Sequence, residues 1–331
     1  MTYDELIKEW LDPDVAFIKA HTSGSTGSPK SILLDKNLVE SSALRTLRFF
    51  HISPQSLIHS CISPDFIGGK MAAIRACVAR CGFSYEPPSN RPAIISEGVG
   101  KIWPDLISVV PSQMLHILEN IHNIPEKTNF LVGGSAINPH LTRMIAESGI
   151  NAWESYGMTE TASHIALRRI SSTPEPFLPL PGIGIRLNSR RCLCISLPNS
   201  DEIITNDIAE ISHCEDGSNR FRILGRADNV IISGGKKIIP EEVENIISPL
   251  LTDLGVGTLM LTSEPDLKWG AATLLLLELP DSSFMTHEYE ERLLLKVTEI
   301  CTIHLPPHDR PKKIRIVPSL PRTSNGKLRR N

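Results

Sequence analysis

Short apolar runs alternate with amphipathic helical patterns over the first two-thirds of the chain. Residues 107–110 and 130–132 are two such runs, and each is predicted to form a strand. A helix is predicted after each strand: one begins at Pro111, and the other begins at Pro139 and ends at Gly149. Repeated strand–turn–helix units predict a layered α/β fold that binds ligands at the C-terminal ends of its strands.

The pattern changes near residue 204, where short β-like runs are separated by polar turns. The elements predicted from there on are strands at 203–204, 208–211, 220–224, 230–232, 271–277 and 313–317, and helices that begin at Pro240 and Glu288. They suggest a compact α+β domain of about a hundred residues. We therefore expect a large layered α/β domain over residues 1–226 and a smaller, mobile α+β domain over residues 227–331.

The composition is that of a packed globular protein. Hydrophobic residues make up 41% of the chain, charged residues 21%, and the formal net charge is −3. Without a long basic run, this charge argues against a nucleic-acid partner. The seven cysteines are scattered, which predicts a reducing, cytoplasmic compartment rather than a disulfide framework or a paired-cysteine zinc site. No apolar run approaches about eighteen residues, so no membrane span is expected.

The polar segment from Thr22 to Ser31 raises the main question about function. Its sequence, TSGSTGSPKS, imitates the spacing of a nucleotide-binding P-loop, but Pro29 stands where the second glycine should be. Proline has no N–H to donate, so the segment cannot form the backbone cradle of a P-loop ATPase. Its glycines and hydroxyls can still face phosphate oxygens, with Lys30 as a cation. Taken alone, the segment is explained equally well as a polar turn.

This segment resembles the phosphate loop of the adenylate-forming superfamily, which comprises acyl-CoA synthetases, adenylation domains and luciferases. In that family a proline is expected before the lysine. Four further segments resemble motifs of the same family, in the same order: Gly133-Gly134-Ser135-Ala136, Tyr156-Gly-Met-Thr-Glu160, residues 225–235, and Pro321-Arg-Thr-Ser-Asn-Gly-Lys327. Five ordered motifs are far more specific than any one of them, so the chain is identified as a member of this superfamily.

The resemblance implies an acid–thiol ligase that uses ATP, forms an acyl-adenylate and releases pyrophosphate and AMP. The implied ATP-binding residues are Thr22, Ser23, Gly24, Ser25, Thr26, Gly27, Lys30, Gly133, Gly134, Ser135, Ala136, Tyr156, Asp207 and Arg226. Thr159 would contact the α-phosphate, Glu160 would hold Mg²⁺, and Lys327 would be the catalytic lysine. A carboxylate oxygen suits Mg²⁺, and a lysine suits a place where two anions meet.

The resemblance also implies residues for the second half of the reaction. Asp228 would be the hinge about which the small domain rotates, although such a residue is also an ordinary turn former. Gly234 and Gly235 would let the pantetheine arm of CoA approach the backbone closely. A hairpin turn explains the same pair of glycines.

The chain departs from the family pattern in two places. The ribose motif T-G-D appears as Thr205-Asn206-Asp207, so the aspartate is kept and the glycine is not. Twenty-one residues precede the phosphate loop, whereas family members carry a much longer segment there. We therefore expect part of the N-terminal subdomain to be absent or reduced, which would affect the outer wall of the acid pocket and the oligomer surface but not the nucleotide site.

Residues between the motifs predict the acid. Residues 108–113, 156–163 and 232–242 resemble the o-succinylbenzoate–CoA ligases of menaquinone synthesis, whose substrate has a second carboxylate. Phe66 falls where histidine is usual. Arg75, nine positions later, is the first candidate partner for the second carboxylate, and Lys70 is the second. His164 could line the pocket. A cation on a helix surface explains Arg75, and a structural histidine explains His164, equally well.

Three functions follow. The first is ligation of o-succinylbenzoate to CoA, with Mg²⁺ as cofactor. The second keeps adenylation but loads another aryl or acyl acid onto CoA or a carrier-protein thiol. The third, a non-catalytic nucleotide-binding relative, is disfavoured because Lys30, Glu160, Asp207 and Lys327 are retained. The expected partners are a small-molecule carboxylic acid, ATP and CoA, and the resemblance allows a homodimer.

Overall fold

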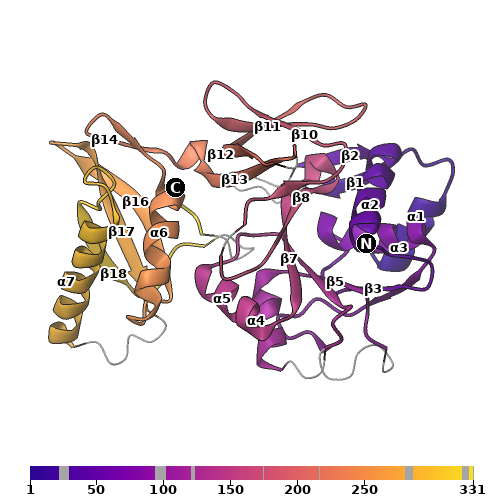
Figure 1. The fold of residues 1–331 in the computed structure, drawn as a ribbon, viewed down its shortest axis with the longest axis horizontal. Coiled ribbons are helices and arrows are strands. Elements are labelled where there is room, and N and C mark those ends of the chain that lie inside the picture. Colours follow the sequence, from indigo (N-terminus) through magenta and orange to yellow (C-terminus); the bar gives the residue numbers. More distant parts are fainter. Residues whose placement is uncertain are drawn as a thin grey trace. The chain divides into compact units, whose positions relative to one another are not determined.

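The computed structural model describes residues 1–21, 30–93, 102–120, 124–173, 175–215, 217–279, 286–322 and 328–330 (Figure 1). Contacts divide the chain into two compact units. The first comprises Met1–Ile185, Ile195–Ile203 and Ser212–Phe221, and the second comprises Arg186–Cys194, Ile204–Ile211 and Arg222–Asn331. The domain boundary predicted after residue 226 stays a prediction.

The first unit is built on a seven-stranded sheet with the strand order β4-β3-β5-β6-β7-β8-β9. Its strands are β3 (Leu57–Ser60), β4 (Gly82–Tyr85), β5 (Leu106–Val109), β6 (Asn129–Val132), β7 (Asn151–Met158), β8 (Ser163–Arg169) and β9 (Leu178–Pro179). The five strands from β4 to β7 run parallel, and β8 and β9 are added antiparallel. The predicted layered α/β architecture is therefore confirmed.

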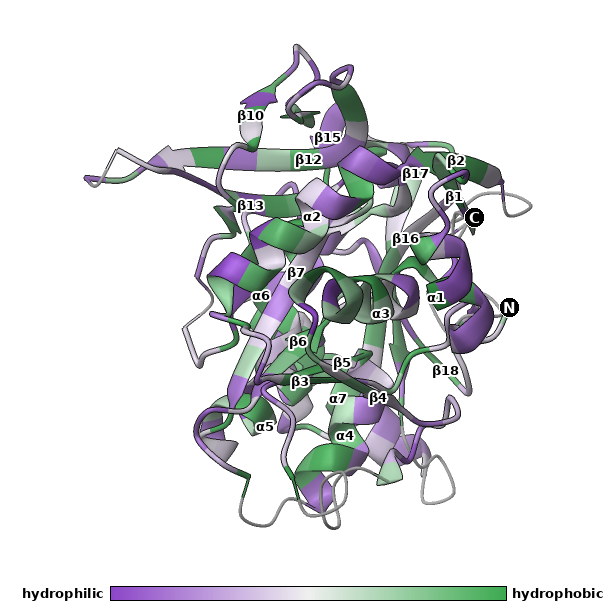
Figure 2. Cartoon of the chain, turned by 90° about the vertical axis from the view of Figure 1, so that its right-hand side faces the viewer, coloured by the Kyte–Doolittle hydropathy of each residue, from purple (hydrophilic) through white to green (hydrophobic). Residues whose placement is uncertain are grey.

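Helices pack on both faces of this sheet. They are α2 (Lys36–Phe49), α3 (Ile67–Ala79), α4 (Pro111–Glu119) and α5 (Pro139–Ser148), with α1 (Tyr3–Leu11) beside α3. Successive side chains of a strand point to opposite faces. Accordingly, Leu106 of β5 joins the apolar cluster of α2 and α3, and its neighbour Ile107 joins that of α4 and α5. Figure 2 shows α3 and the central strands as predominantly hydrophobic, as burial from both sides requires.

Local signals define these elements closely. The predicted start of α4 at Pro111 is confirmed, as is the start of α5 at Pro139. The side chain of Asn138 accepts a hydrogen bond from the Leu141 N–H and so caps α5. Gly149 ends α5 with φ of +74°, a left-handed conformation that glycine adopts without a steric cost.

The second unit has its own sheet and core. Strands β16 (Thr258–Asp266), β17 (Gly270–Glu278) and β18 (Lys313–Val317) form a sheet in that order, with β16 antiparallel and β18 parallel to β17. Apolar residues of α6 (Pro240–Thr252) and α7 (His287–His304) pack on it. Strand β16, the antiparallel partner of β17, was not predicted from the sequence.

Three smaller β structures carry motif residues. Strands β1 (Phe17–His21) and β2 (Ser31–Asp35) form a hairpin, and β14 (Ile231–Ser233) and β15 (Lys236–Ile238) form another. A four-stranded sheet has the order β10 (Gly184–Leu187), β11 (Cys192–Ser196), β12 (Ile203–His213) and β13 (Asn219–Arg226). The predicted runs 203–204 and 208–211 are parts of the single strand β12. None of the helices in the described ranges has the length and apolar character that crossing a bilayer requires.

Candidate active site

The residues on either side of the predicted phosphate loop are paired. His21 at the end of β1 stands opposite Ser31 at the start of β2. The predicted ATP-binding residues Thr22, Ser23, Gly24, Ser25, Thr26 and Gly27 lie outside the described residues. Lys30 is exposed directly before β2.

The Thr159–Glu160 motif adjoins the same hairpin. It forms the short helix η2 (Thr159–Thr161), in which Thr159 is buried and Glu160 is exposed. The Thr159 hydroxyl donates a hydrogen bond to the carbonyl of His21, at 3.4 Å. Two motifs that are far apart in the sequence therefore meet where the phosphate loop begins.

The predicted adenine turn follows β6. Gly134 has φ of +92°, and Gly134, Ser135 and Ala136 are exposed. A Cβ at Gly133 would lie 2.4 Å from the Oγ of Ser155 on the neighbouring strand β7, so only glycine fits there without a shift. The turn is thus packed tightly against β7 at Gly133 and exposed from Gly134 to Ala136. It lies at the C-terminal edge of the parallel strands, where such folds bind ligands.

An aromatic cluster that the sequence analysis missed supports Tyr156 on β7. The Tyr156 ring lies 5.7 Å from the ring of Phe177 and 5.2 Å from that of Phe221. Phe177 and Phe221 stack on each other and exchange backbone hydrogen bonds. The guanidinium of Arg168 lies 4.4 Å from the centre of the Phe177 ring. These contacts orient the tyrosine that is predicted to stack on adenine.

Gly157 allows β7 and β8 to pair beside this tyrosine. The register shifts between Tyr156 and Gly157, and a Cβ at Gly157 would lie 2.3 Å from the Ser163 carbonyl oxygen and 2.4 Å from the Cα of His164. We expect Gly157→Ala to lower the free energy of unfolding by about 1–3 kcal/mol, because the backbone of β8 must move. Urea unfolding measures this.

The matched control for that prediction is Gly68→Ala. A Cβ at Gly68 in α3 would meet the Ile62 side chain, whose Cδ1 end at 3.3 Å can move and whose Cγ2 lies at an ordinary contact distance of 4.0 Å. Alanine is also favoured over glycine in a helix by about 1 kcal/mol. Similar losses in the two variants would contradict the proposed role of Gly157.

A group of polar side chains joins α2, α3 and β8. Arg75 of α3 is only 1% exposed, and its Nη2 lies 3.2 Å from the Oγ of Ser163 and 3.4 Å from Nδ1 of His164. On the other side of the ring, Nε2 of His164 lies 3.1 Å from Oγ1 of Thr46. Arg75 is therefore not a helix-surface cation, and the structure brings it together with His164 as one buried group.

Arg45 of α2 is a second buried cation, which the sequence analysis missed. It is 7% exposed, and its Nε and Nη2 have no hydrogen-bond partner within the described ranges; the same holds for Nε of Arg75. Among the described residues, no carboxylate acts on either guanidinium: burial is the one cause that shifts the pKa of each. Leaving buried cations without an anion costs several kcal/mol each.

The protonation states follow from this surrounding. Burial lowers the pKa of Arg75 to about 9, so at neutral pH the guanidinium keeps its charge. Burial also lowers the pKa of Arg45. Burial, with Arg75 and Arg45 adding to it, holds the pKa of His164 well below its usual range, so the imidazole is neutral. The group therefore combines two positive charges with a neutral ring, a charge balance that an anion would complete.

The other two candidates for the acid pocket lie elsewhere on α3. Phe66 precedes the helix and is 50% exposed. Lys70 is buried, but its Nζ lies 3.1 Å from Sδ of Met1, and the charges that act on it are those of Glu9 and Asp65. Among the described contacts, none joins Lys70 to Arg75.

In the second unit, Arg226 connects two of the predicted motifs. Its Nη1 lies 3.2 Å from Asp207 Oδ1, and its Nη2 lies 2.7 Å from Asp228 Oδ2. Burial acts to lower the pKa of Arg226, but the hydrogen bond to Asp228 and the charges of nearby carboxylates outweigh it and raise that pKa. Asn206, which stands in place of the glycine of the family motif, is exposed on β12.

Gly234 and Gly235 form the turn between β14 and β15, so the hairpin explanation holds. Gly234 has φ of +55°, its N–H donates to the carbonyl of Trp269, and a Cβ there would lie 2.7 Å from the Trp269 ring. The ammonium groups of Lys268 and Lys312 lie 4.9 and 4.8 Å from the centre of this ring. Contact of these glycines with CoA stays a prediction.

Lys327 lies outside the described residues, but its neighbours are anchored. Arg322 and Leu328 form an antiparallel bridge, and the Arg329 N–H donates to the carbonyl of Pro321. Beyond them, Nη1 of Arg330 lies 2.6 Å from Oε1 of Glu244 on α6. The ends of the segment that carries the predicted catalytic lysine are thus fixed to the second unit.

Comparison with known proteins defines the family. The model of the AMP-binding enzyme family matches residues 3–191, more than half of the chain. A 2-succinylbenzoate–CoA ligase of Listeria monocytogenes serotype 4b (strain F2365) is 30% identical over 355 residues, covering 98% of this chain and 71% of the ligase. The chain thus spans about seven-tenths of that relative's length.

Two solved structures share the fold. An acyl-CoA synthetase (AMP-forming)/AMP-acid ligase II-like protein from Dyadobacter fermentans is 28% identical with a TM-score of 0.62, covering 99% of this chain and 91% of that one. The o-succinylbenzoate CoA synthetase of Bacillus subtilis, in complex with ATP and magnesium ion, is 23% identical with a TM-score of 0.75. The match covers 94% of this chain and 68% of that one. This chain belongs to the AMP-binding enzyme family, and its class is that of the AMP-forming acid–CoA ligases.

Proposed function

We propose that the protein ligates o-succinylbenzoate to CoA through an o-succinylbenzoyl-adenylate. The observation that carries this proposal is the buried pair Arg75 and Arg45, which surrounds His164 and has no carboxylate partner in the described ranges. An acid with one carboxylate at the reaction centre and a second one elsewhere would supply the missing negative charge. A fatty acid would leave both buried guanidiniums without an anion, which is unfavourable.

In the first half-reaction, a carboxylate oxygen forms a bond to the α-phosphorus of ATP while the bond to pyrophosphate breaks. The protein contributes mainly positioning and electrostatics to such a step. Tyr156 stacks on adenine, supported by Phe177 and Phe221, and Asp207 accepts hydrogen bonds from the ribose. Lys327 contributes a positive charge to the reacting anions.

Glu160 is the residue that would hold Mg²⁺. It presents an exposed, hard oxygen donor next to Thr159, whose hydroxyl bonds the carbonyl that precedes the phosphate loop. One or two carboxylates together with substrate phosphates suit the way proteins bind this ion. When bound there, it would neutralise charge on the phosphates and help pyrophosphate leave.

In the second half-reaction, the thiol sulfur of CoA bonds to the acyl carbon and AMP leaves. Asp228, six residues into the second unit's continuous stretch that begins at Arg222, is the hinge residue in this proposal. We expect Asp228→Pro to spare adenylation and to abolish most thiol transfer, because proline restricts the backbone that must rotate. Rapid-quench assays of the two half-reactions measure this split.

Asp228→Ala is the matched control. It removes the same carboxylate from Arg226 Nη2 but leaves the backbone free, so thiol transfer should continue. If both variants lost transfer equally, the ion pair rather than the hinge would matter.

The proposal is tested by CoA-ester formation, followed by mass spectrometry, over a panel of acids with ATP and Mg²⁺. The panel contains o-succinylbenzoate, 4-oxo-4-phenylbutanoate (the same molecule without its ring carboxylate), benzoate, malonate and a fatty acid. Selective ligation of o-succinylbenzoate would support the proposal and a place in menaquinone synthesis. Ligation of a different acid only, or loading of a carrier-protein thiol in preference to CoA, would replace it.

A further inference from the structure

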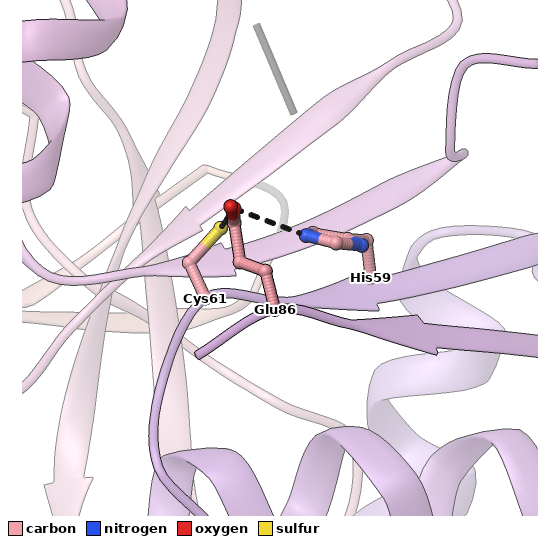
Figure 3. A group of neighbouring side chains, drawn as sticks. All are labelled: His59, Cys61 and Glu86. Atoms are coloured by element: carbon pink, nitrogen blue, oxygen red, sulfur yellow. Dashed lines mark hydrogen bonds and ion pairs between the residues drawn. The ribbon is translucent and has the colours of Figure 1, made fainter. Parts of the chain in front are cut away.

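Three potential metal ligands, none of them among the residues assigned to the proposed reaction, converge at the edge of the first unit's sheet (Figure 3). Oε1 of Glu86 lies 3.1 Å from Sγ of Cys61 and 3.4 Å from Nε2 of His59. All three ligand atoms lie within 4.8 Å of one another. Distances of this size place each atom within a small movement of a shared ion.

The parallel pairing of β3 with β4 produces this convergence. His59 stands opposite Ser84, and Ser60 stands opposite Tyr85, so both strands end at the same edge. Cys61 directly follows β3, and Glu86 directly follows β4. Because side chains alternate along a strand, His59 and Cys61 point to the same face. Three ligand types thus come from two adjacent segments of a rigid sheet.

The orientation of each ligand is fixed by further contacts. Nδ1 of His59 lies 2.9 Å from the hydroxyl of Ser84, which leaves Nε2 to face Glu86. The second carboxylate oxygen of Glu86 accepts a hydrogen bond from the Ala93 N–H. The Cys61 carbonyl accepts a hydrogen bond from the side-chain amide of Gln113, at 2.7 Å. Outer contacts of this kind orient the ligands in metal sites.

Charge and burial identify the ion. His59 is 3% exposed and Cys61 is 1% exposed, and Glu86 is partly buried. A thiolate and a carboxylate carry two negative charges between them, which a divalent cation neutralises in a buried place. One sulfur, one nitrogen and one oxygen ligand suit Zn²⁺ and do not suit Mg²⁺ or Ca²⁺, which take oxygen ligands.

We propose that His59, Cys61 and Glu86 bind one Zn²⁺ ion per chain, with a water molecule as the fourth ligand. The Cys61 thiol gives up its proton to solvent as the sulfur–metal bond forms. The ion joins the edge strand β4 to β3 and so stabilises this end of the sheet. It takes no part in the adenylation chemistry.

Cobalt substitution tests the proposal without any activity assay. Untagged protein, freed of metal with a chelator, is titrated with Co²⁺, which gives a near-ultraviolet thiolate-to-metal charge-transfer band when a cysteine binds it. We expect one equivalent of Co²⁺ to saturate this band and one equivalent of Zn²⁺ to abolish it. Zn²⁺ should also raise the thermal unfolding midpoint.

Variants assign the band to these residues. Cys61→Ser should lose it, and His59→Gln should weaken Co²⁺ binding strongly while the band stays at high Co²⁺. Ser84→Ala keeps all three ligands and should weaken binding about tenfold to a hundredfold. The control is the double variant Cys77→Ser/Cys81→Ser, which should bind like the parent. These two half-buried thiols, one in the last turn of α3 and one just after the helix, lie outside the cluster.

Two results would overturn the proposal. One is a parent protein without a saturable charge-transfer band. The other is a band that survives in Cys61→Ser but disappears in the Cys77→Ser/Cys81→Ser variant, which would assign the metal to those thiols. The Co²⁺ titration of the parent protein alone shows whether a cysteine binds the metal. Failure of one variant to fold therefore does not prevent the test.

Discussion

Replacing Lys327 by alanine is expected to slow formation of the acyl-adenylate by about a hundredfold to a thousandfold, the usual effect of removing one preorganised electrostatic contact in an active site. The reaction brings the substrate carboxylate to the α-phosphate of ATP, so a cation is needed where the two anions meet. Transfer of the acyl group from preformed adenylate to CoA has no such encounter. The rate of acyl transfer to CoA should therefore change little in this variant.

The measurement compares the two half-reactions in one preparation. Pyrophosphate exchange reports the first half-reaction, and CoA-ester formation from synthetic adenylate reports the second. Lys296→Ala is the control, since this lysine is exposed on α7 and carries no proposed role. Equal losses in both half-reactions of the Lys327 variant would show that the lysine does not act mainly in adenylation.

Replacing Arg75 by methionine is expected to have opposite effects on function and on stability. Removing one partner of a buried charge pair costs roughly 2–5 kcal/mol of binding, so the KM for o-succinylbenzoate should rise at least about thirtyfold. The KM for 4-oxo-4-phenylbutanoate, which lacks the ring carboxylate, should change much less. Without ligand, the variant should unfold at a higher temperature, because an apolar side chain replaces a buried cation that has no anionic partner and whose Nε makes no hydrogen bond in the described ranges.

Steady-state kinetics with the two acids and thermal unfolding without substrate measure these effects. Lys70→Met tests the alternative candidate, whose ammonium faces Met1. If Lys70→Met raised the KM for the dicarboxylic acid selectively and Arg75→Met did not, the second carboxylate would bind near Lys70. Arg45→Met should resemble Arg75→Met, since Arg45 is also buried with unpaired N–H groups.

The sequence predicted those parts of the fold that local signals specify. Helix α5 is an example, because Pro139 and Gly149 mark its two ends and Asn138 caps it. Strand β12 is a counterexample. The polar residues Asn206 and Asp207 divide its apolar pattern, yet pairing with β11 and β13 makes it one continuous strand. Tertiary pairing there outweighs the local pattern.

The candidate site shows the same division. Motif order predicted Tyr156 and Thr159, because the family resemblance spans short, contiguous segments. Phe177 and Phe221 could not be predicted, since they meet Tyr156 only after the sheet forms. The burial of Arg45 could not be predicted either, because a lone arginine in an amphipathic helix is ordinarily solvent-exposed. Its burial against β8 depends on how α2 packs.

Activation of a dicarboxylic aromatic acid as an acyl-adenylate is tested most directly by mass spectrometry of the products after the protein is mixed with ATP, Mg²⁺ and o-succinylbenzoate in the absence of CoA. We expect o-succinylbenzoyl-AMP and pyrophosphate in equal amounts, and loss of the adenylate when CoA is added. ATP binding without any acyl-AMP would contradict the proposed activity and would favour a nucleotide-binding relative without catalytic activity.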